Sequence, residues 1–174
     1  MATETPQPPI TKSSIITLRE ITKQNWREIT GLTLPSSQQG NVANNVKSLC
    51  EAHYSEDAWV RGVYAGDTPV GFLMMSIWEP EEWYAVWRFM IDHRYQRMGF
   101  GARAIKLAIE YVKENHPQAK LIRLMSTSSE GKGSKNGTPA VSAGDSPYGF
   151  YKGLGFRDIG ELDENEEIEM GLDL

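Results

Sequence analysis

The feature that most constrains the fold is a glycine-containing loop between an apolar strand and an amphipathic helix. Residues 83–91 are almost continuously apolar, interrupted only by Arg88, as expected for a central strand buried on both faces. Residues 100–115 show the periodicity of a helix whose inner stripe is Ile105, Ala108, Ile109 and Val112. The loop between them, residues 96–101, would present backbone N–H groups and the positive end of a helix dipole. We therefore predict that this loop cradles a pyrophosphate.

Other phosphate-binding loops fit this sequence less well. Residues 131–134, Gly-Lys-Gly-Ser, lack the upstream glycine and the preceding strand of a P-loop. After Gly99 and Gly101 there is no third glycine at the offset that dinucleotide-binding folds require, which disfavours NAD. A glycine turn that serves only packing is the remaining alternative.

The other segments predict a mixed α/β domain. Residues 119–125 should form a strand parallel to 83–91, because a right-handed helical crossover joins the two. A compact turn at residues 66–69 indicates a hairpin. The remaining expectations are strands at 14–20, 58–65, 70–78, from 156 and at 166–172, helices from Asn25, at 41–53 (stripe Val42, Val46 and Leu49) and at 147–153, and a mobile loop at 126–144.

Length and composition favour one domain. We expect a disordered N-terminal tail at residues 1–13, rich in Thr, Pro and Ser, and one domain at residues 14–174. The single cysteine, Cys50, and the absence of zinc-binding or CxxC spacing predict no metal site and a reducing, cytoplasmic location. No apolar run has membrane-spanning length.

The charge distribution argues against a nucleic-acid partner. Of the 23 acidic residues, seven lie in residues 161–174, which leaves 16 acidic against 18 basic residues in the rest of the chain. This nearly balanced body lacks the basic stripe that nucleic-acid binding requires.

The loop also matches the pattern Q/R-x-x-G-x-G/A, and residues 87–96 and 150–156 add a matching strand and an FYxxLGF segment. In these motifs the sequence resembles the GCN5-related N-acetyltransferase (GNAT) superfamily. Gln38, residues 40–44 and residues 48–49 resemble the early helix of its spermine/spermidine (diamine) acetyltransferase branch. The resemblance implies a single-domain α/β fold: a mixed, largely antiparallel sheet with a splayed parallel central strand pair, flanked by helices.

The resemblance also implies the binding site for acetyl-CoA. Backbone groups of three strand residues would pair with the pantetheine arm, and the loop amides would hold the pyrophosphate. The family often has an asparagine before its late helix, where this chain has Ser146 as a substitute. The implied cofactor-binding residues are Phe89, Met90, Ile91, Gln96, Arg97, Met98, Gly99, Phe100, Gly101, Ala102 and Ser146.

The sequence signals for the catalytic groups are less specific than those for the cofactor site. By resemblance Tyr151 is the general acid that protonates the thiolate, and its alternative role is core packing. Glu82 and Asp92, at the two ends of the central strand, are candidate bases acting through water, although Asp92 could cap the loop and Glu82 could belong to a solvated turn. Cys50 has no activating partner in sequence, so covalent catalysis is disfavoured.

These expectations combine into one function. We expect an enzyme that transfers acetyl directly from acetyl-CoA to a primary amine, with a small polyamine or diamine favoured by the branch resemblance. An antibiotic or a protein or peptide amine as acceptor, or a non-catalytic acyl-CoA-binding sensor, remain as alternatives. The C-terminal strand could pair across a homodimer or finish the internal sheet.

Overall fold

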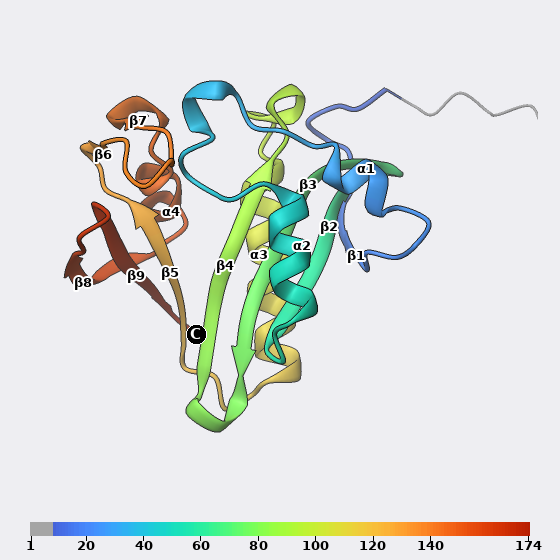
Figure 1. The fold of residues 1–174 in the computed structure, drawn as a ribbon. Helices are drawn as coiled ribbons and strands as arrows, with labels where there is room; N and C mark the ends of the chain where they lie inside the picture. The colour runs from blue at the N-terminus through green and yellow to red at the C-terminus, as the bar shows by residue number, and fades with distance from the viewer. Residues whose placement is uncertain (1–8) are drawn as a thin grey trace, which may run out of the picture.

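A computed structural model describes residues 9–174 and places one seven-stranded sheet at their centre (Figure 1). The strand order is β1-β2-β3-β4-β5-β9-β8, in which β4 and β5 are parallel and the other neighbours are antiparallel. This confirms the predicted mixed sheet with a parallel central pair. The strands are β1 (Ile16–Arg19), β2 (Ala58–Ala65), β3 (Thr68–Trp78), β4 (Trp83–Ile91), β5 (Leu121–Thr127), β8 (Arg157–Leu162) and β9 (Glu167–Asp173).

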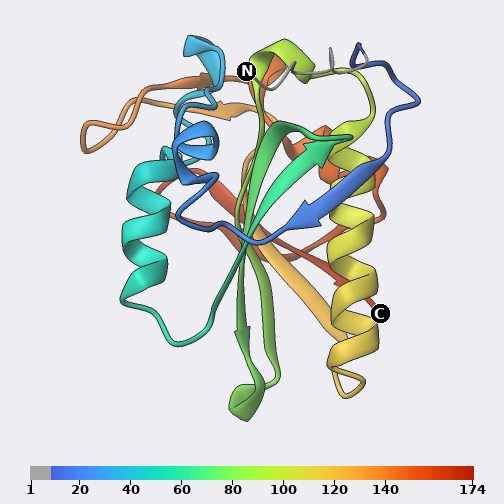
Figure 2. The same cartoon turned by 90° about the vertical axis from the view of Figure 1, so that its right-hand side faces the viewer.

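Helices cover both faces of the sheet. Helices α1 (Trp26–Thr30) and α2 (Asn45–His53) lie on one face and α3 (Phe100–Asn115) on the other, as Figure 2 shows for α2 and α3. The short α4 (Tyr148–Gly153) precedes β8. The sheet therefore separates two apolar clusters, one under α3 and one under α1 and α2.

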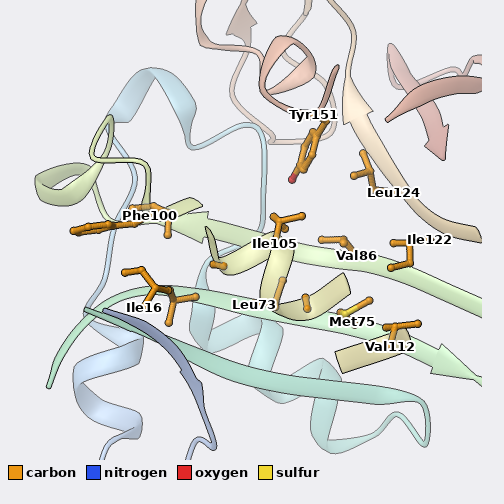
Figure 3. Packing of buried hydrophobic residues seen from close by; sticks show 14 of the residues in the cluster. Ile16, Leu73, Met75, Val86, Phe100, Ile105, Val112, Ile122, Leu124 and Tyr151 are labelled. Carbon is orange, nitrogen blue, oxygen red and sulfur yellow. The ribbon is translucent and has the colours of Figure 1, made fainter. Parts of the chain in front are cut away.

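The cluster under α3 follows the predicted helical stripe. Ile105, Ala108 and Val112 are buried, Ile109 is half-buried, and Ala104 joins the stripe. Figure 3 shows Ile105 and Val112 among apolar side chains of strands β3 and β4.

The stripe predicted for α2 is wrong in part. The helix begins at residue 45 rather than 41, and Val46 is 54% exposed. Asn45 and Ser48 take the buried positions instead, because each satisfies a backbone carbonyl: Asn45 Nδ2 donates to Ile29 O at 2.8 Å and Ser48 Oγ donates to Asn44 O at 3.0 Å. A polar side chain bonded in this way can be buried at little cost.

The segment at 126–144 contains more regular structure than a loop. It includes the paired strands β6 (Gly131–Lys132) and β7 (Val141–Ser142), followed by a short 3-10 helix at Ala143–Asp145. The hairpin turn is also shorter than predicted, because β3 already begins at Thr68.

The two ends of the chain are attached differently. Residues 1–8 of the expected N-terminal tail lie outside the described residues. The segment that follows them is attached to the domain, because Arg103 donates to Lys12 O and Ser14 O, both at 2.7 Å, and Ile10 packs against the core. At the other end β9 pairs with β5 and β8, so this strand lies within the internal sheet and β8 forms the edge. Among residues 9–174, no helix is long and apolar enough to cross a membrane.

Candidate active site

The parallel pair at the centre of the sheet opens along its length. Strands β4 and β5 pair only at Ala85–Arg123 and Val86–Leu124, and beyond that point they diverge (Figure 1). In the described structure, residues 87–91 therefore have no strand partner on the side away from β3. Buried backbone N–H and C=O groups require partners, so this edge can accept a ligand that carries amides.

A bulge lies where the strands begin to separate. Met74 pairs with Arg88 and Met75 with Val86, which leaves Trp87 as an extra residue in β4. Val86 belongs to the cluster under α3, whereas both Trp87 and Arg88 face a cavity on the α2 side. The bulge thus turns two consecutive side chains toward α2.

The predicted glycine loop connects this edge to the N-terminus of α3. Arg97 and Gly99 have positive φ angles of 60° and 78°, and Gly99 caps the helix. N–H groups in the first turn of a helix lack intrahelical acceptors, and here they gather at the loop. Gln96 Nε2 donates to Ile91 O at 3.1 Å and to Gln38 Oε1 at 2.8 Å, so it joins the loop to β4 and to the α1–α2 connection. The local geometry suits an anion.

Asp92 is enclosed and fully engaged in hydrogen bonds. Its side chain is 1% exposed and accepts from Thr33 N at 2.9 Å, Arg94 N at 3.1 Å and Arg94 Nε at 2.7 Å. Burial acts to raise the pKa of Asp92, but these hydrogen bonds and the Arg94 charge outweigh burial and lower it. Of the two roles considered from sequence, this geometry suits capping of the loop rather than proton abstraction.

Glu82 lies at the opposite end of β4 from the loop. It is exposed, it has a φ of 49°, and it follows the 3-10 helix Glu79–Glu81. Trp87 lies five residues further along the chain, a span of about 16 Å at the usual rise per residue of a strand. The structure therefore does not bring Glu82 and Asp92 together.

Tyr151 projects from α4 toward the opening between the strands. Figure 3 shows its oxygen pointing toward β4, and the ring lies in one cluster with Val86 and Leu124, the last paired residues. The side chain is 7% exposed, and burial raises the pKa of its hydroxyl. Within residues 9–174 no hydrogen bond to this hydroxyl is formed. A buried phenol that stays protonated can act as a proton donor.

Ser146 holds the start of α4 beside the end of β5. Its hydroxyl donates to Thr127 O at 2.9 Å and accepts from Tyr148 N at 3.2 Å. Ser146 therefore supports the helix that carries Tyr151, and both hydrogen bonds leave its oxygen engaged within the protein.

On the α2 side of β4 lies a cavity of about 610 Å³. Its walls come from β4, the start of α2, the connection before it and the β6–β7 segment, and its charged lining residues are Lys47, Arg88, Lys132 and Glu167. Sequence reasoning missed this group. The available signal was Arg88, the one charged residue in an otherwise apolar strand. Among the residues described, no group of three or more His, Cys, Asp or Glu side chains could hold a metal ion.

Comparisons with known proteins by sequence and by structure agree on one family. The sequence matches the acetyltransferase (GNAT) family over residues 18–136, and no match was found among curated proteins. An aminoglycoside 6′-N-acetyltransferase complexed with coenzyme A superposes with a TM-score of 0.65 at 13% identity, over 91% of this chain and 96% of that one.

Two further structures share the fold. The spermidine/spermine N-acetyltransferase SpeG from Vibrio cholerae gives a TM-score of 0.63 at 16% identity, over 93% of this chain and 94% of that one. The ribosomal-protein-S18-alanine N-acetyltransferase from Escherichia coli gives 0.61 at 14% identity, over 91% and 94%. These neighbours act on different acceptors, so the likeness concerns the fold.

Proposed function

The chain belongs to the acetyltransferase (GNAT) family, and on this premise we propose that it transfers an acetyl group directly from acetyl-CoA to a primary amine. The observation that carries the proposal is the opening between β4 and β5, with the glycine loop at one end and the Tyr151 hydroxyl beside the last strand pair. A donor bound along this opening would place its thioester near Tyr151.

The residues proposed to bind acetyl-CoA fit its chemistry. Pantetheine contains two amides, and the unpaired edge at Phe89, Met90 and Ile91 offers backbone partners for them. The amides of residues 97–102 lie at the start of α3, where the helix dipole favours a pyrophosphate. A Cβ at Gly99 would meet no atom within 4 Å, so the surface there is open to a ligand.

The proposed chemistry requires one proton donor and one proton acceptor. The amine nitrogen forms a bond to the acetyl carbon as the carbon–sulfur bond breaks, and Tyr151 gives its proton to the departing thiolate. The proton from the amine passes to water, since Asp92 is enclosed and Glu82 is remote from the opening. Ser146 would hold α4, and therefore Tyr151, in position.

The acceptor is a separate proposal. The sequence resemblance to diamine acetyltransferases supports a small polyamine, and the alternatives are an antibiotic or a peptide amine. A cavity of this volume suits a small molecule. We also place the enzyme in a reducing, cytoplasmic compartment, on the basis of its single cysteine, Cys50.

Thiol release from acetyl-CoA tests the proposal directly. The full chain would be assayed with polyamines, amino acids, aminoglycosides and peptides, with acetylated product identified by mass spectrometry. We expect amine-dependent release of CoA with one acceptor class. Tight acetyl-CoA binding without turnover on any amine would instead support the sensor alternative.

A further inference from the structure

Arg88 is the one charged residue of β4, and its side chain is 23% exposed in the cavity on the α2 side. Its Nη1 donates to Trp87 O at 3.0 Å and its Nη2 to Glu51 Oε2 at 3.3 Å. Its Nε is buried and has no hydrogen-bond partner among the described residues. A desolvated donor without a partner is unfavourable, which makes this guanidinium a candidate for ligand binding.

The neighbouring charges leave this wall of the cavity positive. Glu51 is shared by Arg88 and by Lys47, whose Nζ lies 3.7 Å from it. On the other wall Lys132 and Glu167 form their own pair at 2.6 Å. The cavity lining therefore holds three basic side chains and one acidic one, while Glu51 pairs with two of the basic side chains from outside the lining.

This arrangement bears on the charge of the acceptor. Because Glu51 is already bound by two cations, a polyamine ammonium group would have to displace one of them. An anionic group would instead balance the excess positive charge and could accept from the Nη N–H groups that Trp87 O and Glu51 leave unused. Guanidinium groups favour carboxylates because two parallel hydrogen bonds can form.

We propose that the acceptor amine carries a carboxylate and that Arg88 binds this carboxylate, so that Arg88 determines the specificity of the enzyme. This rests on the proposed acetyl transfer, and it competes with the polyamine acceptor that the sequence resemblance supports. Arg88 lies at the bulge, two residues after the last β4–β5 pair, so a carboxylate bound there would hold a nearby amine at the opening between the strands. The substrate class is an amino acid or a similar small amino acid-like compound.

Pairs of amines that differ only in a carboxylate test the proposal. L-Ornithine would be compared with putrescine, and L-lysine with cadaverine, by kcat/KM for CoA release. We expect the wild-type chain to prefer the carboxylate-bearing member by about tenfold or more, the effect of one hydrogen bond to a charged group. A preference for the diamines would overturn the proposal.

Substitutions of Arg88 assign the effect to this side chain. Arg88→Gln should remove the preference by lowering kcat/KM for the amino acids about tenfold or more, with a smaller change for the diamines. Arg88→Lys keeps the charge but loses the two-pronged geometry, so it should retain part of the preference. An unchanged preference in folded Arg88→Gln would exclude Arg88.

A matched control lies on β2, which β3 separates from β4. Arg61 of β2 donates to the preceding carbonyl, Val60 O, at 2.8 Å and stacks on Trp59, much as Arg88 bonds to and lies over Trp87, but it does not line the cavity. Arg61→Gln should leave the ratio between ornithine and putrescine unchanged.

Calorimetric binding separates this inference from the proposed function. L-Ornithine and putrescine would be titrated into the full chain saturated with CoA. Arg88-dependent binding of ornithine without any turnover would contradict the acetyltransferase proposal and support carboxylate recognition. Turnover or binding without a carboxylate preference would contradict the inference alone.

Discussion

Replacing Asp92 distinguishes a carboxylate that anchors the loop from one that acts as a base. In Asp92→Ala the backbone amides of Thr33 and Arg94 lose their acceptor, and the Arg94 side chain loses its partner. Buried hydrogen bonds to a charged group are each worth about 1.5 kcal/mol or more. The Arg94 side chain is 55% exposed, so its ion pair adds little.

The loss of the two hydrogen bonds from the backbone amides predicts a decrease of about 3 kcal/mol in the free energy of unfolding. For a chain of this size that corresponds to a fall in Tm of about 6–12 °C. Urea unfolding and calorimetry would measure both quantities. Because the anchored loop precedes the proposed pyrophosphate site, acetyl-CoA affinity should fall as well.

Measuring the free energy of unfolding against pH tests the anchoring role of Asp92 independently. The pKa of Asp92 is lowered in the folded chain, because its hydrogen bonds and the Arg94 charge outweigh the effect of burial. The stabilisation is therefore fully present above the unfolded value of about 3.9 and is lost as the pH falls through the folded value. The stability difference between the wild type and Asp92→Asn should shrink over that acidic range.

Asp67 provides the control. It pairs with Arg19 at 3.1 Å on the surface, with side-chain exposures of 75% and 41%, so Asp67→Ala should change stability by about 1 kcal/mol at most. A loss below about 1 kcal/mol for Asp92→Ala would refute the anchoring role. A folded Asp92→Asn with normal acetyl-CoA affinity but no turnover would show that Asp92 is the base.

Three further substitutions test the site. Tyr151→Phe keeps the ring beside Phe156 and removes a hydroxyl without a described partner, so kcat should fall about 10²–10⁴-fold with urea stability unchanged; an unchanged rate would remove Tyr151 as acid. Gly99→Val places a branched residue at a φ of 78° and should abolish acetyl-CoA binding in calorimetry, which unaltered affinity in a folded variant would contradict. Gly40→Ala would press a Cβ against Pro139 O, so it should raise the KM for the amine and leave acetyl-CoA affinity unchanged.

The sequence predicted the elements whose periodicity is regular and whose ends are marked. Helix α3 begins and ends at the predicted residues, because its apolar stripe is continuous and glycine precedes it. Helix α2 was predicted less well, because Asn45 and Ser48 are buried through hydrogen bonds to distant or preceding carbonyls that no local pattern reveals. Long-range contacts also determine the role of Asp92 as an anchor of the loop, because its hydrogen-bond partner Thr33 lies 59 residues away in the sequence.

The bulge at Trp87 explains why the sequence did not predict that Arg88 faces the cavity on the α2 side. Strict alternation from Val86 would place Arg88 on the α3 face, within an apolar core where an unpaired guanidinium is costly. The extra residue keeps Trp87 and Arg88 together on the α2 face and returns Phe89 to the α3 side, where it stacks on Phe150 at 6.2 Å. Because residues 83–91 are apolar on both faces, their pattern cannot show where the alternation shifts. One inserted residue thus lies where the edge that we propose for the donor begins, and it turns the charge that we assign to the acceptor toward the cavity.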